Sequence, residues 1–309
     1  RVPRLSVVIP VYRSEETILL LAERLQAVLE TCDGGYEIIC VDDHSPDETW
    51  AALEAWAKQC PSLRCIKLRR NAGQHNAILC GFSHVQGDIV ITMDDDLQNP
   101  PEEIPKLVHA IERGYDVAIG SYETKQHSIV RNTSGGLIDR IQRLMFGLPR
   151  NFQLTSFRAI RGDIAHAVAT QTSTFPYITS MILAHSGSYI NVPVRHDARL
   201  KGVSNYGVVR SIRLASNLLM AYSVVPLIVA AIACFIVLVG AIAFAIWVLA
   251  RAVIDGDTPP GWASTILVTT GLTTINLGTL LLLLLYVSRM YRHVTRSQVP
   301  FSVERILES

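Results

Sequence analysis

The sequence has almost no net charge and few of the motifs that would assign a function at once. Its 28 lysines and arginines balance 27 acids to a net charge of +1, so the overall charge indicates neither a nucleic-acid binder nor a binder of acidic substrates. The six cysteines form no C-x-x-C pair and have no histidine partners at zinc spacing. No G-x-G-x-x-G follows the first predicted strand, which argues against a dinucleotide-dependent oxidoreductase.

Two long segments near the C-terminus lack charged residues altogether. Val224–Ala250 and Thr258–Ser288 contain no Asp, Glu, Lys or Arg, and each exceeds the roughly 20 residues that a helix needs to cross a bilayer. We therefore predict transmembrane helices at 223–251 and 263–288, joined by an external loop at 252–262. A buried hairpin of two core helices is the alternative.

The charges that flank these segments predict their orientation. Arg210 and Arg213 precede the first segment and further basic residues follow the second, whereas the connector carries Asp255 and Asp257. Cytoplasmic loops are enriched in Lys and Arg. We therefore expect a multi-pass protein of the cytoplasmic (inner) membrane, with the N-terminal domain and the tail at 289–309 in the cytoplasm.

The first 120 residues alternate short apolar strands with helical patterns. This alternation predicts a Rossmann-like α/β domain over residues 1–207, with a mostly parallel sheet and crossover helices. Strands are expected at Leu5–Pro10, Glu37–Val41, Cys65–Leu68, Asp88–Met93, Val117–Gly120 and Tyr189–Val194, and helices at Glu15–Leu29, Asp47–Lys58, Gln74–Ser83 and Glu102–Glu112. Residues 121–160 lose the alternation, and there we expect a loop and a helix near the active site. An amphipathic helix at 208–222 would lie in the membrane interface or pack on the domain.

Three consecutive acids, Asp94, Asp95 and Asp96, end the fourth predicted strand. Open α/β sheets bind ligands beyond the carboxyl ends of their parallel strands, and packed carboxylates stay ionised when a cation neutralises them. Hard oxygen ligands suit Mg²⁺ or Mn²⁺. The triplet therefore predicts a metal site, with a solvated acidic turn as the alternative.

Three more loops follow strands at the same predicted edge of the sheet. They span Pro10–Glu15, Asp42–Ser45 and Arg69–His75. An acid at the end of the second strand can accept a hydrogen bond from a base N–H or a ribose hydroxyl. Asn71 and Gly73 can cap the following helix and let the backbone approach a ligand closely. These loops together indicate a nucleotide site, although a single Asp pair is more often a turn and a helix cap.

At these positions the chain resembles the family 2 glycosyltransferases of the GT-A fold, specifically the polyprenyl-phosphate sugar transferases that include dolichyl-phosphate mannose synthases. The stretches Gly73–Ile78, Gly81–Asp88 and Asp94–Ile104 are especially similar to undecaprenyl-phosphate 4-deoxy-4-formamido-L-arabinose transferases. The resemblance runs from about Leu5 to Tyr291 and includes the two C-terminal segments.

The resemblance implies roles for single residues. It places Pro10, Tyr12, Asp42 and Asp43 at the base and ribose, where Asn71, Gly73, Gln74, Asp94 and Asp95 complete the expected nucleotide site. Asp94 and Asp96 match the ends of the D-x-D motif and, with Gln98, are the expected ligands of Mg²⁺ or Mn²⁺. Arg131 matches a basic position at the acceptor phosphate, and we expect it to act with Asp94 and Asp96 in catalysis. Further contacts to the acceptor or phosphates are expected from Arg158, Arg199, Ser204, Asn205 and Tyr206.

The sequence departs from the family pattern at three places. Arg13 and Ser14 stand where the first motif usually has Asn and Glu, and Asn205 replaces a Lys. Asn151–Ser156 contains no acid, whereas relatives usually offer there an Asp sometimes proposed as the base. A polyprenyl phosphate is largely ionised at neutral pH because the second pKa of such a monoester is about 6. The missing Asp is therefore compatible with activity.

We expect an inverting, metal-dependent transfer of a sugar from a nucleotide diphosphate sugar, a UDP-sugar, to polyprenyl (undecaprenyl) phosphate at the cytoplasmic membrane face. Related enzymes often assemble through their membrane segments, which allows a homo-oligomer. Two alternatives stay open. One is a glycan-extending membrane glycosyltransferase, although the Q-x-x-R-W motif of processive synthases is absent. The other is a catalytically silent scaffold that binds a nucleotide sugar.

Overall fold

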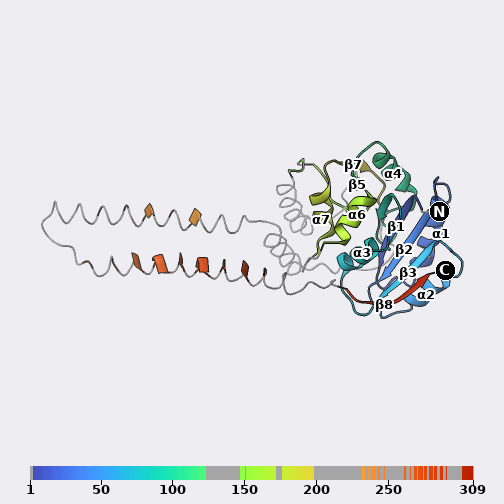
Figure 1. Cartoon of the computed structure of the whole chain (residues 1–309), viewed down its shortest axis with the longest axis horizontal. Coiled ribbons are helices and arrows are strands. Elements are labelled where there is room, and N and C mark those ends of the chain that lie inside the picture. The colour runs from blue at the N-terminus through green and yellow to red at the C-terminus, as the bar shows by residue number, and fades with distance from the viewer. Residues whose placement is uncertain are drawn as a thin grey trace. The chain divides into compact units, whose positions relative to one another are not determined.

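The computed structural model describes residues 3–122, 147–149, 151–171, 176–197 and 301–308, together with scattered positions from Ile232 to Met290. The chain divides into two compact units. The first comprises Arg1–Ile212 and Ser297–Ser309, and the second comprises Arg213–Arg296. The described strands belong to the first unit (Figure 1).

An eight-stranded sheet forms the centre of the first unit. Its strands are β1 (Leu5–Val11), β2 (Tyr36–Asp42), β3 (Leu63–Leu68), β4 (Ile89–Thr92), β5 (Val117–Ser121), β6 (Arg158–Arg161), β7 (Tyr189–Pro193) and β8 (Val303–Glu308). Their order across the sheet is β7-β5-β6-β4-β1-β2-β3-β8. The pairs β1–β2, β1–β4, β2–β3 and β5–β7 are parallel, while β6 and β8 run antiparallel to their neighbours. The predicted α/β fold with a mostly parallel sheet is thereby confirmed.

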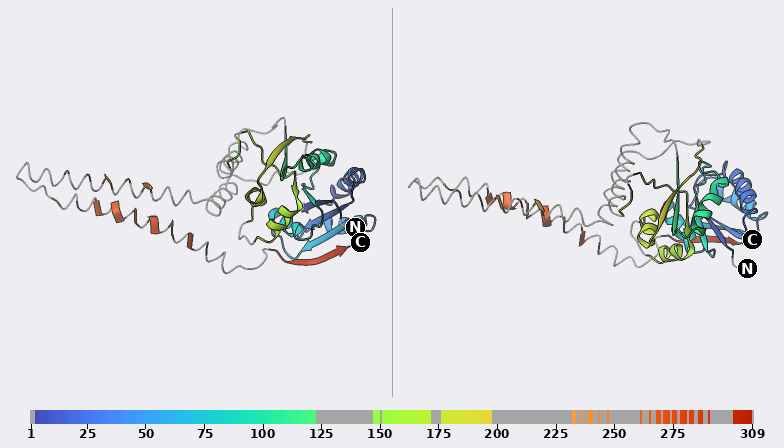
Figure 2. Two further views of the ribbon diagram at one scale, coloured as in Figure 1. Left: turned by 45° about the horizontal axis from the view of Figure 1, so that its top comes forward. Right: turned by 90° about the horizontal axis from the view of Figure 1, so that it is seen from above.

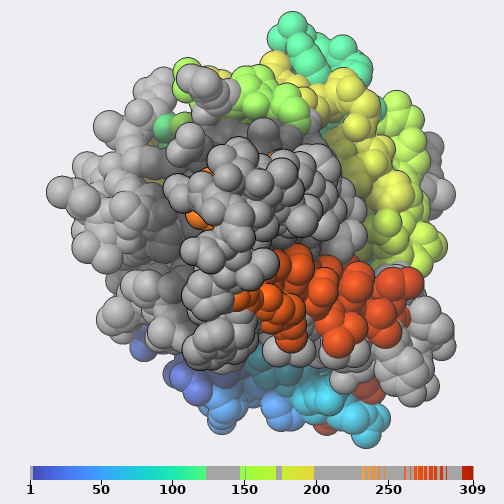
Figure 3. All heavy atoms as spheres, turned by 90° about the vertical axis from the view of Figure 1, so that its left-hand side faces the viewer, coloured from blue at the N-terminus to red at the C-terminus, as the bar shows by residue number. Residues whose placement is uncertain are grey.

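Helices cover both faces of this sheet. One face packs against α1 (Ile18–Leu29), α2 (Thr49–Ala57) and α4 (Ile104–Glu112), the last preceded by a short 3-10 helix, η1 (Pro101–Glu103). The other face packs against α3 (Gln74–Phe82), α6 (Gly162–Ala169) and α7 (Ile178–His185). Helices α6 and α7 contact each other, and the yellow-green and yellow segments that contain them adjoin in Figure 3.

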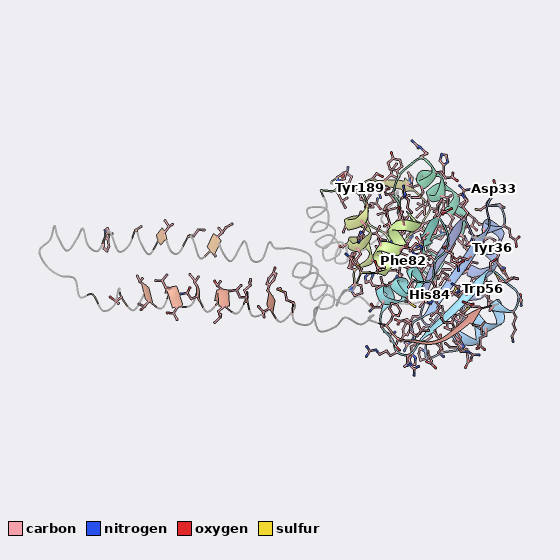
Figure 4. All side chains as sticks on the ribbon, viewed as in Figure 1. Asp33, Tyr36, Trp56, Phe82, His84 and Tyr189 are labelled. Carbon is pink, nitrogen blue, oxygen red and sulfur yellow. The ribbon has the colours of Figure 1, made fainter. Side chains whose placement is uncertain are left out.

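The alternating side chains of β1 explain why both faces are covered. Val7 and Ile9 contribute to the core on the α1 side, and Val8 contributes to the core on the α3 side. Helix α3 approaches β1 so closely that a Cβ atom on Gly81 would overlap Val8. The last residue of α3, Phe82, is fully buried (Figure 4), a burial that contributes about 1.5–3 kcal/mol.

The N-terminal elements lie close to their predicted positions, with small differences at their ends. Helix α1 begins at Ile18 rather than Glu15, because the chain first makes a turn in which the Ser14 carbonyl accepts the N–H groups of Thr17 and Ile18. Later in the chain, β6, α6, α7 and β8 were not predicted. Strand β8 lies in the tail expected at 289–309 and runs beside β3 (Figure 2).

Most of the predicted membrane region lies outside the described residues. Nothing of 208–222 is described, and the scattered described positions within 223–288 are helical. In the described part of the chain, no helix is long and apolar enough to cross a membrane. The two transmembrane helices therefore stay a prediction.

Candidate functional site

The loops after β1, β2 and β4 lie at one edge of the sheet, because these strands are parallel neighbours. Each loop holds one non-glycine residue in the left-handed region: Arg13 with φ 58°, His44 with φ 58° and Leu97 with φ 59°. Such a conformation costs on the order of 1–3 kcal/mol per residue and persists where the surrounding structure imposes it. Strain of this kind clusters at functional sites, so this edge is the candidate site.

Asp42, the last residue of β2, offers an unpaired acceptor at this edge. The residue is fully buried. Its Oδ1 accepts the Ser45 N–H at 3.0 Å, which fixes the carboxylate in the loop after β2. Its Oδ2 has no hydrogen-bond partner among the described residues. A buried carboxylate oxygen without a donor is costly, and a ligand N–H or O–H would satisfy it.

Asp43 holds the neighbouring loop in place. Its two carboxylate oxygens accept the N–H groups of Ala72 at 2.6 Å and Gly73 at 2.8 Å. Its backbone carbonyl accepts the Asn71 side-chain N–H at 3.1 Å. Burial raises the pKa of Asp43, and the two backbone N–H groups oppose that rise. Both oxygens are thus engaged within the protein, and the predicted nucleotide contact of Asp43 stays untested.

Asp95, the middle acid of the triplet, joins the loops after β4 and β1. Its Oδ2 accepts the Tyr12 N–H at 3.1 Å and a short hydrogen bond from the Ser14 hydroxyl. Burial raises the pKa of Asp95 to about 7, against the effect of these two donors. An ionised glutamate at position 14 could not donate such a bond and would repel Asp95. Ser14 therefore suits this loop despite its departure from the family pattern.

Asp94 connects α3 to the segment before β6. Its Oδ1 accepts the Gln74 side-chain N–H at 2.6 Å, and its Oδ2 accepts the Ser156 hydroxyl at 2.5 Å. Gln74 is the first residue of α3, directly after Gly73, which has a φ of 90°. The predicted site residues Gln74 and Asp94 are thus brought together, and Ser156 from the segment without acids joins them.

Asp96 and Gln98 share a tight turn. The Gln98 backbone N–H donates to Asp96 Oδ1 at 3.1 Å, and the Gln98 side chain lies against His196, with their Nε2 atoms 3.5 Å apart. Across the described ranges, no three His, Cys, Asp or Glu side chains converge into a ready-made metal site. The two carboxylates and the amide at this edge would therefore need oxygen ligands from a substrate to complete a metal's shell.

A family model described as glycosyl transferase family 2 matches residues 6–173, which is more than half of the 309 residues. The chain belongs to this family. The protein is thus a glycosyltransferase, as the sequence predicted. The matched range runs from the second residue of β1 to just beyond α6 and includes all the strand ends described above.

Solved structures support the fold of this glycosyltransferase. Glucosyl-3-phosphoglycerate synthase from Mycobacterium tuberculosis, in complex with Mn²⁺ and UDP-glucose, is 19% identical with a TM-score of 0.52. That match covers 71% of this chain and 79% of that one. The same enzyme in complex with Mg²⁺ and UDP is 18% identical, with a TM-score of 0.52 and the same coverage of 71% and 79%. At this identity the likeness concerns the fold.

Arg158, predicted at a phosphate, is buried within the glycosyltransferase sheet. Its Nε donates to the Thr92 hydroxyl at 3.0 Å and its Nη1 donates to the Thr179 hydroxyl at 2.9 Å. Burial lowers the pKa of Arg158 to about 10, while Tyr177 and Asp94 oppose that shift. These bonds join β4 to α7, and a phosphate contact of Arg158 stays untested.

Of the other predicted site residues of the glycosyltransferase, the structure describes only Pro10 and Tyr12. Pro10 lies within β1, and the Tyr12 side chain after it is 43% exposed and therefore accessible to a ligand. The remaining predicted phosphate contacts, Arg131, Arg199, Ser204, Asn205 and Tyr206, lie outside the described residues.

Two aromatic residues at this edge were missed from the sequence. Tyr122 follows β5 and His196 follows β7, and their rings stack with centroids 4.1 Å apart at 30°. The signal that could have found them was the one used for the other loops, namely a polar or aromatic residue just after a predicted strand. Tyr122 and His196 show this pattern after the strands predicted at 117–120 and 189–194.

Proposed function

We propose that this glycosyltransferase moves a sugar from a UDP-sugar to a polyprenyl phosphate at the cytoplasmic face of a membrane, with Mg²⁺ or Mn²⁺ bound beside Asp96. The observation that carries the donor side is the meeting of Asp42, Asp96 and Gln98 at strand ends of one sheet edge. The acceptor side rests on the family resemblance and on the two charge-free segments.

The nucleotide would bind over the loops after β1 and β2. Asp42 Oδ2, which no described residue bonds, is an acceptor for a base N–H, and the exposed Tyr12 ring offers a surface on which the base can stack. Uracil has an N–H that can donate to such a carboxylate. The similar glucosyl-3-phosphoglycerate synthase is described in complex with UDP and UDP-glucose, which supports a uridine nucleotide here.

The residues beyond β4 fit a hard divalent metal. Asp96 and Gln98 can supply carboxylate and amide oxygens, and Asp94 is two residues from Asp96 in the same loop. Such ions commonly keep part of their shell for substrate phosphates. The bound ion would stabilise the charge on the departing diphosphate.

The chemistry proposed for the acceptor needs no protein base. A phosphate oxygen of the lipid attacks the anomeric carbon, the bond from that carbon to the diphosphate breaks, and UDP leaves with inverted configuration in the product. The attacking phosphate is already ionised near neutral pH, since its second pKa is about 6. This is consistent with Ser156, which lies in the segment without acids and donates to Asp94 rather than acting as a base.

Membrane attachment would bring the enzyme to the lipid phosphate. The charge-free segments lie within Arg213–Arg296, and the chain returns to the first unit at Ser297, where β8 pairs with β3. We propose that the segments cross the membrane at 223–251 and 263–288 and that Arg131, Arg199 and Tyr206 meet phosphates. A homo-oligomer assembled through the membrane segments is compatible with this arrangement.

Mass spectrometry of the product formed from a panel of nucleotide sugars tests the proposal. With undecaprenyl phosphate and Mn²⁺, one UDP-sugar should yield a lipid carrying one sugar on a monophosphate, and Asp96→Ala should abolish it. Phosphoglyceric acid serves as a second acceptor, because the similar synthase is described in complex with it. Sugar transfer to that acid alone would overturn the lipid acceptor. Tight UDP binding without transfer from any donor would favour the silent scaffold.

A further inference from the structure

The loop after β7 is attached to the D-x-D loop at several points. The Asp197 N–H donates to the Gln98 carbonyl at 2.9 Å, and Arg195 Nε donates to the buried Glu103 at 2.9 Å. Between these attachments, His196 Nε2 lies 3.5 Å from the Gln98 side-chain Nε2. The two loops come from strands far apart in the sheet order, so these contacts hold together two separate parts of the site.

The imidazole of His196 is held in one orientation. Its ring stacks on Tyr122, whose hydroxyl donates to Asn99 Oδ1 at 2.6 Å. The Tyr122 backbone is fixed in turn, because its N–H donates to Gln153 Oε1 and its carbonyl accepts from Gln153 Nε2, both at 3.1 Å. His196 Nδ1 is buried without a partner in the described part of the chain. Nε2 is therefore the ring nitrogen that faces Gln98.

We propose that His196 is a positioning residue that turns the carboxamide of Gln98 toward the metal. When the imidazole carries its proton on Nδ1, Nε2 can accept an N–H of the Gln98 amide at the 3.5 Å contact, and the amide oxygen, the other end of the planar group, then points away from His196. The oxygen is then available to an ion held by Asp96, whose Oδ1 already accepts the Gln98 backbone N–H at 3.1 Å. The inference rests on the proposed metal site. It adds that His196 determines whether the oxygen or the nitrogen of the Gln98 amide faces the ion.

Two variants separate hydrogen bonding from packing. His196→Phe keeps an aromatic ring to stack on Tyr122 but has no nitrogen to accept from Gln98. His196→Gln lacks the ring but carries an amide oxygen that can take the place of Nε2 as acceptor. If His196 acts through Gln98, the phenylalanine variant loses metal affinity and the glutamine variant retains most of it. A packing role alone predicts the reverse order.

The measurement is the Kd of the full-length protein for Mn²⁺ in the presence of UDP, from the electron paramagnetic resonance signal of the free ion. Outer partners of metal ligands typically affect affinity by 10–100-fold, so we expect His196→Phe to raise the Kd by about that factor. Gln98→Ala should raise it at least as much. The double variant should be no weaker than Gln98→Ala, because residues that act as a unit are not additive. His166→Ala, an exposed histidine on α6, is the control and should leave the Kd unchanged.

The outcomes that overturn the inference are distinct from those that overturn the proposed metal site. Wild-type affinity in His196→Phe would contradict the positioning role, and additive losses in the double variant would show that His196 binds the ion itself or acts elsewhere. Asp96→Ala tests the site: if it binds Mn²⁺ like the wild type, both the metal site and the role of His196 fail. If Asp96→Ala loses the ion while His196→Phe keeps it, only the positioning role fails.

Discussion

Acids that look alike in the sequence have different partners at the edge of the sheet. Asp42 has one oxygen that no described residue bonds, Asp43 accepts from two backbone N–H groups, and Asp95 joins the loops after β1 and β4. Asp94 and Asp96 are the acids that we propose at the metal. The role of each acid therefore depends on the hydrogen-bond donors around it. Substituting one acid at a time should distinguish these roles.

The first prediction compares Asp42→Asn with Asp43→Asn. In Asp42→Asn the remaining oxygen can still accept from Ser45, but an NH₂ group takes the place of the unpaired oxygen and faces a donor of the base. A hydrogen bond to a charged group contributes about 1.5–3 kcal/mol, so we expect UDP binding to weaken by about 10- to 100-fold with little change in unfolding temperature. Calorimetric titration with UDP and thermal unfolding measure the two effects.

Asp43→Asn should show the opposite pattern. One of the N–H groups of Ala72 and Gly73 would then face an NH₂ group, and a buried donor without an acceptor costs about 1–3 kcal/mol. The unfolding temperature should fall, and UDP affinity should fall less than in Asp42→Asn. If both variants lose UDP affinity equally without loss of stability, Asp43 contacts the nucleotide as the family resemblance implied, and its role within the loop is secondary.

At the scale of elements, the sequence predicted the predominantly apolar strands and missed β6 and β8. Strands β1 and β4 are largely apolar and buried along their whole length, as is typical of parallel strands between helices. Strand β6 reads Arg-Ala-Ile-Arg, too short to show any periodicity. Strand β8 reads Val-Glu-Arg-Ile-Leu-Glu, whose apolar residues are spaced as on a helix. Its strand conformation comes from pairing with the edge of β3, which local sequence does not encode.

The site, too, has features that the sequence predicts and features that depend on contacts between distant loops. The loops that follow the predicted strands were found because parallel strands bring their carboxyl ends together. Which of Asp42 and Asp43 is unpaired could not be read from the sequence, because the N–H groups that engage Asp43 belong to Ala72 and Gly73 in another loop. His196 was missed for a similar reason, since its contact with Gln98 joins the loops after β7 and β4, which β5 and β6 separate in the sheet order.

Strand β8 should protect the edge of β3, and deleting residues 303–309 tests this role. The deletion would expose unpaired backbone groups of β3, which promote association between sheets, and would remove the contact of Leu307 with the core. We expect a lower unfolding temperature and aggregation, measured by thermal unfolding and light scattering in detergent. Arg305→Gln is the control, because it removes only the exposed 3.0 Å ion pair with Glu54. Such pairs contribute about 0–1 kcal/mol, and a deletion no more harmful than this control would contradict the protective role.

For the whole molecule, β8 has a consequence for membrane topology. Residues on both sides of Arg213–Arg296 belong to the first unit, and β3 and β8 are neighbouring strands of one sheet. A sheet forms within one compartment. If the charge-free segments enter a membrane, the chain must therefore cross it an even number of times, so that the connector at 252–262 faces the opposite side from both the domain and the C-terminus.

Labelling of single cysteines with a membrane-impermeant maleimide tests this topology. In a background with Cys32 and Cys234 replaced by Ser, Asp257→Cys should react in intact cells, whereas Ser309→Cys should react only after the membrane is opened. The other cysteines, Cys40, Cys60, Cys65 and Cys80, are buried in the folded domain and should stay unlabelled under native conditions. Labelling of both sites from outside would place the C-terminus, and with it β8, apart from a cytoplasmic domain. Labelling of neither until lysis would mean that the connector does not cross, and the charge-free segments would then be buried within the protein rather than in a bilayer.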